Sequence, residues 1–408
     1  MSNTKSNTDK LAILDVSWHH HKCFREIQET ILHAARELGY DCLFTSDTSL
    51  DDRIYIVFSI SICRIPLKNL PRRIILYNLE QIYANSPFFE KGWNYQDYLF
   101  QYPLWDYSLA NISQLKQWGI DRIEYLPIGY MPQLTRISHA ANKDIDVLFY
   151  GSINERRQKI IDGLLAKGVR VESLFGVYGE ERDSYIARSK IVLNIHFYDA
   201  KIFEIVRISY LLANRVFVIS EKGNNSEEED YFSKGLVFCD YESLVDACIE
   251  YLDKDEEREK IAERGFQLMS QRPATEYLQK ALTSTLETGI DETKFVVDFC
   301  RKIAAKTLFE NGEYEKAIQL YEQSIEVDST CWDSYIYLGL SYLYNGDDLA
   351  ACLTWSNGIA ALEKTGITEE KLESQFRQIL SSEMAKHCGG YNEHFALKLE
   401  RALQEGLL

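Results

Sequence analysis

The sequence predicts an α/β fold of two parallel-sheet, Rossmann-like domains, followed by an all-α helical domain. Three observations support this architecture. Short apolar runs alternate with amphipathic helical segments through the first 290 residues, which is typical of βαβ units. The alternation stops at a polar stretch, residues 129–144, and then restarts. The last quarter of the chain shows a 34-residue repeat instead.

The alternation gives an ordered set of elements in each half. In the first half we expect strands at 11–17, 41–45, 54–59, 73–78, 106–110 and 123–128, and helices at 22–38, 80–86 and 112–118. In the second half we expect strands at 146–151, 169–175, 191–197, 216–220 and 236–240, and helices at 154–167, 179–189, 203–214, 226–234 and 242–252. The expected domains span 1–135, 140–290 and 291–408. Two such sheets create a cleft, and open α/β sheets bind ligands at the carboxyl ends of their strands.

Composition and missing motifs exclude several classes of protein. The 408 residues are 46% hydrophobic and carry a net charge of −17, which argues against a dedicated nucleic-acid binder. No run reaches the roughly 20 apolar residues of a transmembrane segment, and the polar start MSNTKSNTDK lacks the apolar core of a signal peptide. The nine cysteines form no CxxC pair, so we expect a reduced, cytoplasmic protein without a zinc site. The absence of GxGxxG, GxxxxGK[ST] and GxSxG disfavours dehydrogenases, NTPases and α/β-hydrolases.

The repeat in the last quarter combines glycine, alanine and aromatic positions. The pairs 34 residues apart are Gly312 and Gly346, Ala317 and Ala351, and Tyr321 and Trp355. With Leu338, Gly339 and Tyr342, the pattern resembles the tetratricopeptide repeat, in which small residues let two helices approach and an aromatic ring fills the groove between them. We expect two such units with degenerate caps, which would bind a protein partner or mediate self-association. The alternative is an ordinary helical bundle with coincidental spacing.

The second half carries the most informative stretches, DVLFYGSINERRQ, RSKIVLN and RISYLLANRVFVIS. Together they resemble the nucleotide-binding half of group 1 glycosyltransferases of the GT-B fold, near the CgeB-like branch. The resemblance implies a hexosyl- or related transferase of glycan biosynthesis that takes a UDP-, GDP- or dTDP-sugar as co-substrate. It implies no cofactor and no metal, because a helix N-terminus and arginine stabilise the leaving diphosphate. The acceptor would be a glycan or a protein that enters between the halves. The alternative is a non-catalytic nucleotide-sugar-binding scaffold whose helical repeats bind a protein.

The loop after the first strand of the second half is a candidate diphosphate site. Gly151 and Ser152 end a buried strand and precede a helix, where a missing Cβ and backbone N–H groups allow close approach of phosphate. Arg156 and Arg157 lie in the first turn of that helix, and one of them could pair with phosphate oxygens. Alternatively, both are solvated surface residues beside Glu155.

Polar residues follow the next strands. Asn194 and His196 alternate in IVLNIHFYD and share a face towards the cleft, either as ligand contacts or as a hydrogen-bonded structural pair. Glu204 and Arg207 lie one turn apart, where the resemblance implies the donor's phosphates and ribose. The alternative is a plain helix-surface ion pair.

The sequence departs from the family pattern at one position of this helix. Many members have an acidic residue that holds the ribose where this chain has Tyr210. We therefore expect Glu204, or Glu221 after the following strand, to take that role.

Two segments of the first half could supply a catalytic base. WHHHK (18–22) follows the first strand, in a loop that faces the acceptor in GT-B enzymes, and we favour His20 within it. Glu80 ends another strand at the same cleft and is the other candidate for a base or a sugar-hydroxyl ligand. Alternatively, it is only a carboxylate at a helix N-terminus, where the helix dipole favours a negative charge. The DxD-like residues 144–146 fall at the wrong end of a strand for a metal site. The acidic run 227–230 is expected to be a solvated face, and residues 271–287 to cross back to the first domain.

Overall fold

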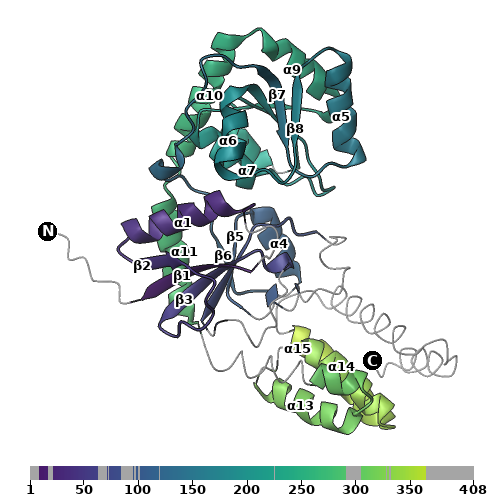
Figure 1. Ribbon diagram of the computed structural model, residues 1–408. Coiled ribbons are helices and arrows are strands. Elements are labelled where there is room, and N and C mark those ends of the chain that lie inside the picture. Colours follow the sequence, from purple (N-terminus) through teal and green to yellow (C-terminus); the bar gives the residue numbers. More distant parts are fainter. Residues whose placement is uncertain are drawn as a thin grey trace. The chain divides into compact units, whose positions relative to one another are not determined.

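The computed structural model describes residues 9–16, 22–62, 71, 73–83, 95, 98–99, 102–118, 120–224, 226–290, 305–327, 329 and 332–363. The chain divides into two compact units, residues 1–290 and 291–408. The first unit contains two parallel β-sheets with flanking helices, and the described part of the second unit is helical (Figure 1). This confirms the expected fold class.

The first sheet has six strands in the order β2-β1-β3-β4-β5-β6, and every neighbouring pair is parallel. The strands are β1 (Lys10–Asp15), β2 (Asp41–Phe44), β3 (Arg53–Phe58), β4 (Ile74–Asn78), β5 (Leu104–Asp106) and β6 (Ile123–Tyr125). Helices α1 (Arg25–Glu37) and α4 (Leu109–Gln117) and the 3₁₀ turn η1 (Ile60–Ile62) connect them.

Two expected elements of this sheet are wrong. Residues 106–110 are not a strand, because β5 ends at Asp106 and the Ser108 side chain caps α4 by accepting the Asn111 N–H. Residues 80–83 are not helical.

The second sheet has five parallel strands in the order β11-β10-β9-β7-β8. The strands are β7 (Ile145–Tyr150), β8 (Val171–Leu174), β9 (Ser189–Asn194), β10 (Val218–Glu221) and β11 (Val237–Cys239). The helices are α5 (Glu155–Ala166), α6 (Gly179–Arg188), α7 (Ile205–Ala213), α8 (Ser226–Phe232), α9 (Leu244–Leu252) and α10 (Asp255–Ser270), with a 3₁₀ turn η4 (Tyr241–Ser243) before α9. In each sheet the strand order reverses beside the first strand, between β1 and β3 and between β7 and β9. Such switch points leave a crevice at the carboxyl ends of the strands.

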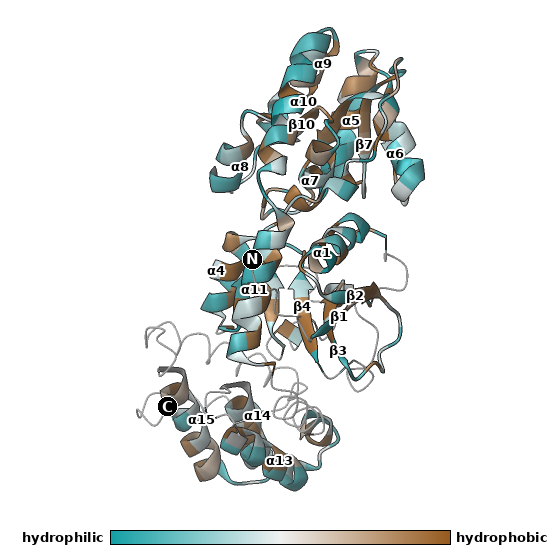
Figure 2. Cartoon of the chain, turned by 90° about the vertical axis from the view of Figure 1, so that its left-hand side faces the viewer, coloured by the Kyte–Doolittle hydropathy of each residue, from teal (hydrophilic) through white to brown (hydrophobic). Residues whose placement is uncertain are grey.

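The central strands of both sheets are buried on both faces, which explains their apolar runs in the sequence. Residues Val147, Leu148 and Phe149 of β7 are fully buried, as are Ile54, Ile56 and Val57 of β3. Figure 2 shows the hydrophobic colouring concentrated along the strands of the first sheet and on the inner sides of the helices.

Two chain segments cross side by side between the sheet domains. The Tyr130 N–H donates to the Arg272 carbonyl, and the Ala274 N–H donates to the Tyr130 carbonyl at 3.1 Å. The segments touch at Gly129, where a Cβ would lie 2.5 Å from the Ala274 Cα, so a larger residue does not fit. After Tyr130 the first crossing segment continues into the 3₁₀ turn η3 (Pro132–Leu134).

The second crossing segment leads into helix α11 (Ala274–Thr288), which packs on the first domain. Its Leu278 and Leu282 are fully buried, and the Trp105 indole N–H donates to the Thr285 hydroxyl at 2.9 Å. The residues expected to cross back thus lie largely in a helix that contacts α1 and β6, while the expected domain boundaries stay a prediction.

The second unit consists of helical residues 305–310 followed by α13 (Tyr314–Val327), α14 (Trp332–Tyr344) and α15 (Asp348–Glu363). Gly312 and Gly346 occupy the inter-helix turns with φ of 78° and 88°, which only glycine adopts readily. Gly339 lies against Trp355, whose indole N–H donates to the Ile336 carbonyl at 3.2 Å. The repeated positions thus form turns and helix contacts, while the tetratricopeptide assignment stays a prediction.

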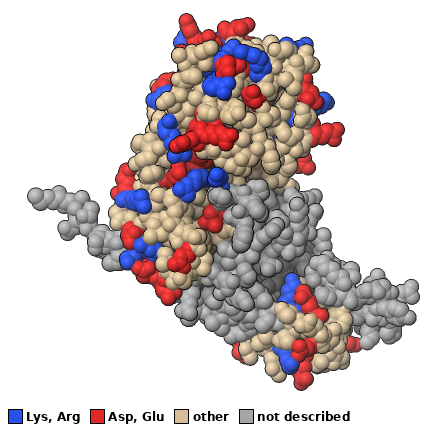
Figure 3. Space-filling model, viewed as in Figure 1, with Lys and Arg blue, Asp and Glu red and all other residues tan. Residues whose placement is uncertain are grey.

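Charged side chains of both signs intermingle on the face of the described residues shown in Figure 3. Within the described part of the chain, no helix combines the length and apolar character needed to cross a bilayer.

Candidate functional site

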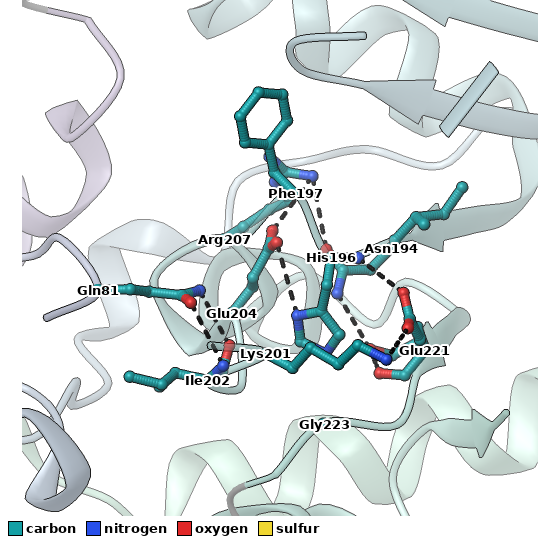
Figure 4. Close-up of polar contacts among 12 residues, drawn as sticks. Gln81, Asn194, His196, Phe197, Lys201, Ile202, Glu204, Arg207, Glu221 and Gly223 are labelled. Atoms are coloured by element: carbon teal, nitrogen blue, oxygen red, sulfur yellow. Dashed lines mark hydrogen bonds and ion pairs between the residues drawn. The ribbon is translucent and has the colours of Figure 1, made fainter. Parts of the chain in front are cut away.

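Most of the predicted donor-site residues come together at the switch point of the second sheet (Figure 4). Asn194 ends β9, Glu221 ends β10, and Gly151 follows β7. Glu204 precedes α7 and Arg207 lies in its first turn. These elements are neighbours because parallel strands place their carboxyl ends at one edge of the sheet.

Arg207 lies at the centre of this group. Its guanidinium is 3.5 Å from the Asn194 amide oxygen and 3.5 Å from the Glu204 carboxylate. It also lies over Gly151, where a Cβ would come within 2.9 Å of an Arg207 nitrogen. Gly151 has a φ of 136°, so the site needs glycine for its backbone conformation as well as for space. Arg207 keeps 22% of its side chain exposed and can meet an anion from solvent.

Glu204 does not form only the plain surface ion pair with Arg207 that was the alternative. Its side chain is 13% exposed and lies 3.3 Å from Arg157, in addition to Arg207. The nearest ring nitrogen of His196 is 3.9 Å away, which is too long for a hydrogen bond. The carboxylate therefore pairs with two arginines, Arg157 of α5 and Arg207 of α7, and His196 lies close by.

His196 is the unusual member of the site. It is 1% exposed, yet neither Nδ1 nor Nε2 has a hydrogen-bond partner. Burial lowers the pKa of the ring below its ordinary value, despite the carboxylates nearby. Gly223 packs against the ring, since a Cβ there would lie 3.0 Å from Nε2. Buried polar groups without a protein partner are rare and costly, which sets this ring apart from the other side chains of the site.

Glu221 anchors the floor of the site. It is 1% exposed and accepts a bidentate hydrogen bond from Arg156, one arm of which measures 2.6 Å. It also accepts the backbone N–H of His196 at 3.0 Å, and Lys201 Nζ lies 3.3 Å away. Burial alone raises the pKa of Glu221, but the bonds from Arg156 and His196 outweigh it and hold the pKa below its usual range.

Arg157 is buried and binds the backbone. Its Nε donates to the Ile195 carbonyl at 2.9 Å and its Nη1 to the Ser152 carbonyl at 2.9 Å. Burial lowers the pKa of its guanidinium to about 10. The alternative in which both Arg156 and Arg157 are solvated is therefore wrong. Their expected role at a diphosphate stays a prediction, because both already hold protein groups.

The first domain contributes Glu80, which follows β4. The Ser61 hydroxyl donates to its carboxylate at 3.2 Å. Burial raises the pKa of Glu80 to about 7, so the carboxyl group can exchange a proton near neutral pH. The other candidate base, His20, lies outside the described residues.

The acidic run 227–230 was expected to be solvated, and this is wrong for two of its residues. Glu229 is 4% exposed and accepts the Gly223 N–H at 2.6 Å, while Glu228 is ion-paired with Arg272 at 2.9 Å. A run of four acids gives no sequence signal that two of them turn inwards.

Tyr210 takes no part in the cluster around Arg207. Its hydroxyl donates to Asp183 at 2.6 Å and accepts from Arg136 at 3.0 Å. The neighbouring Arg182 of α6 binds Glu26 of α1 at 2.7 Å. Tyr210 therefore belongs to a polar contact between the two sheet domains.

The DxD-like residues lie at the amino end of β7, away from the site. Asp144 pairs with Arg188, and Asp146 pairs with Arg170 and Lys190. The described part of the chain contains no group of three or more His, Cys, Asp or Glu side chains arranged to hold a metal ion.

One family of known proteins matches the part of the chain that carries this cluster. Residues 134–279 match the protein family described as "Glycosyl transferase-like". The matched residues include the second sheet domain and the start of α11. The matched region contains every predicted donor-site residue.

The chain is also similar to proteins of Acanthamoeba polyphaga mimivirus. It is 32% identical to uncharacterized protein L137 over 154 residues, which are 36% of this chain and 21% of that protein. It is 29% identical to uncharacterized protein L140 over 212 residues, 50% of this chain and 67% of that protein. The chain thus spans only about a fifth of L137. Among solved structures, HepE of Anabaena with UDP and glucose covers 68% of this chain at 11% identity and a TM-score of 0.48, with 99% of that chain covered. A likeness of this size carries no weight for the site.

Proposed function

We propose that the chain transfers a sugar from a nucleotide-sugar donor to an acceptor hydroxyl, without a metal ion. The observation that carries the proposal is the buried His196 ring, whose two nitrogens lack partners beside Glu204 and Arg207. A ligand hydroxyl completes such a ring, and the arginine beside it suits an anion. A sugar linked to a diphosphate supplies both groups.

Each residue has a distinct role in this proposal. Arg207 and the N-terminus of α7 bind the diphosphate and stabilise the charge that it gains as the bond to the anomeric carbon breaks. His196 and Glu204 bind hydroxyls of the sugar or ribose. Glu221 and Arg157 hold the strand ends and the segment around His196 in place.

The first domain supplies the base. Glu80 takes the proton of the acceptor hydroxyl while the oxygen forms its bond to the anomeric carbon. A pKa of about 7 suits a group that must accept a proton near neutral pH. His20 is the second candidate for this role. The helical unit would then bind a protein, either the acceptor or a partner.

The proposal is tested by nucleotide binding and turnover with matched variants. UDP-, GDP- and dTDP-sugars are screened for a rise in melting temperature, and a ligand at 100 times its Kd should add about 2.7 kcal/mol of stability. Arg207→Ala should abolish the rise. Arg188→Ala, which removes an exposed arginine at the opposite end of the sheet, should keep it.

Three results would count against the proposal. If no nucleotide stabilises the wild type, the donor site is wrong. If Arg207→Ala binds as the wild type does, its role is wrong. Binding without any transfer or donor hydrolysis would favour the non-catalytic scaffold.

A further inference from the structure

Gln81 of the first domain binds the backbone of the donor-site segment in the second domain. Its side-chain amide donates to the Ile202 carbonyl at 3.1 Å and accepts the Ile202 N–H at 3.3 Å (Figure 4). Gln81 is only 6% exposed. The amide therefore pairs with Ile202 through both backbone groups, as a neighbouring strand would.

The turn that carries Gln81 is held by buried side chains. The Asn78 amide oxygen accepts the Glu80 N–H at 3.1 Å, and the Asn111 amide oxygen accepts the Ile82 N–H at 2.8 Å. The Asn111 amide also donates to the Glu80 carbonyl at 2.8 Å. The backbone on both sides of Gln81 thus has hydrogen-bond partners, which fixes the position from which its side chain extends.

The segment that Gln81 holds is the one that supplies His196 and Glu204. Lys201 adopts a left-handed φ of 46°, and its carbonyl accepts the Asn224 N–H at 2.9 Å. Ile202 follows directly, and Glu204 comes two residues later at the start of α7. A shift of Ile202 would therefore move the Glu204 carboxylate relative to the rest of the site.

We propose that Gln81 is a positioning residue that couples the two halves of the reaction site. It ties the turn that carries Glu80, on the acceptor side, to the segment that carries His196 and Glu204, on the donor side. This inference rests on the proposed glycosyl transfer. Its consequence is that one side-chain amide links the turn of the base directly to the donor-site segment, while the residues that bind the diphosphate all lie in the second domain.

The test compares Gln81→Ala and Gln81→Glu with Gln117→Ala, an exposed glutamine of α4, in the full-length chain. The carboxylate of Gln81→Glu keeps the acceptor for the Ile202 N–H but repels the Ile202 carbonyl. Hydrogen exchange of the Ile202 amide reports the contact itself. Transfer kinetics and nucleotide affinity report its effect.

Both Gln81 variants should lose kcat, and Gln81→Ala should also exchange the Ile202 amide faster. A misplacement of about 1 Å costs on the order of 100-fold in rate, so we expect kcat to fall by about that factor. Nucleotide affinity should fall by less than about tenfold, which corresponds to about 1.4 kcal/mol, because Arg207 still binds the diphosphate. Gln117→Ala should change none of these.

The outcomes separate the coupling from the proposed function. A wild-type kcat in Gln81→Ala overturns the coupling alone, and so does an unchanged Ile202 exchange rate. Nucleotide affinity that falls as far as kcat also overturns it, since the residue would then act on binding or folding. A wild-type chain that binds no nucleotide overturns the proposed function, and the coupling with it.

Discussion

Replacing His196 should make the free energy of unfolding depend less on pH below about pH 6.5. Burial lowers the pKa of this ring in the folded chain, whereas the unfolded chain takes up a proton near the ordinary value of about 6.5. Below that pH the unfolded state binds the extra proton, so the free energy of unfolding falls as pH falls. Above it, neither state binds the proton and the contribution is level.

The magnitude follows from one proton. Linkage gives at most about 1.36 kcal/mol per pH unit, so the wild type should lose up to about 1.4 kcal/mol between pH 7.5 and 5.5 through this ring alone. His196→Asn cannot take up the proton and should lack that loss. The substitution also changes the packing of a buried side chain, which lowers the free energy of unfolding at every pH. The quantity to compare is therefore the slope of the free energy of unfolding against pH.

The assay is urea unfolding of the full-length chain at pH 8.5, 7.5, 6.5 and 5.5. The wild-type and His196→Asn curves should run parallel from pH 8.5 to 7.5 and converge below 6.5. Parallel curves down to pH 5.5 would refute the reasoning, because the folded ring would then titrate as it does in the unfolded chain.

Three further predictions concern single contacts. Gly339→Ala should lower the stability of the helical unit by about 1–3 kcal/mol, because its Cβ would lie 2.0 Å from the Trp355 indole, and Trp355→Phe should recover part of the loss in a thermal melt. Glu221→Gln should cost about 3–5 kcal/mol in urea unfolding by breaking a buried ion pair, whereas Asp144→Asn at an exposed pair should cost under about 1 kcal/mol. Transfer activity should rise with pH through about 7 as Glu80 loses its proton, and Glu80→Gln should lose both the activity and this limb of the profile.

The sheet elements were predictable because their physical cause is local. Strands buried on both faces are apolar over most of their length, so β3 and β7 could be found from their residues alone. The error at residues 106–110 has an equally local cause. Ser108 begins a helix as its cap, and its apolar neighbours conceal that role.

The site was predictable only in part, because its remaining contacts join distant residues. The strand ends and α7 could be placed from the alternation, which brought Asn194 and Arg207 to one edge. The bonds between Gln81 and Ile202 join residues 121 positions apart and leave no pattern in either segment. Arg157 of α5 is likewise buried, bound to the Ile195 carbonyl just after β9, whereas its charge alone predicts an exposed side chain.

The paired crossing segments make the second sheet domain an insert in the first. The chain leaves the first domain at Tyr130 and returns beside it at Arg272, and α11 then completes that domain. A fragment cut before α11 would expose the apolar surface that Leu278 and Leu282 cover. A graft of residues 131–272 into a related chain would cut the backbone at two adjacent points. The second sheet domain could therefore be exchanged as one piece, with the first sheet domain left whole.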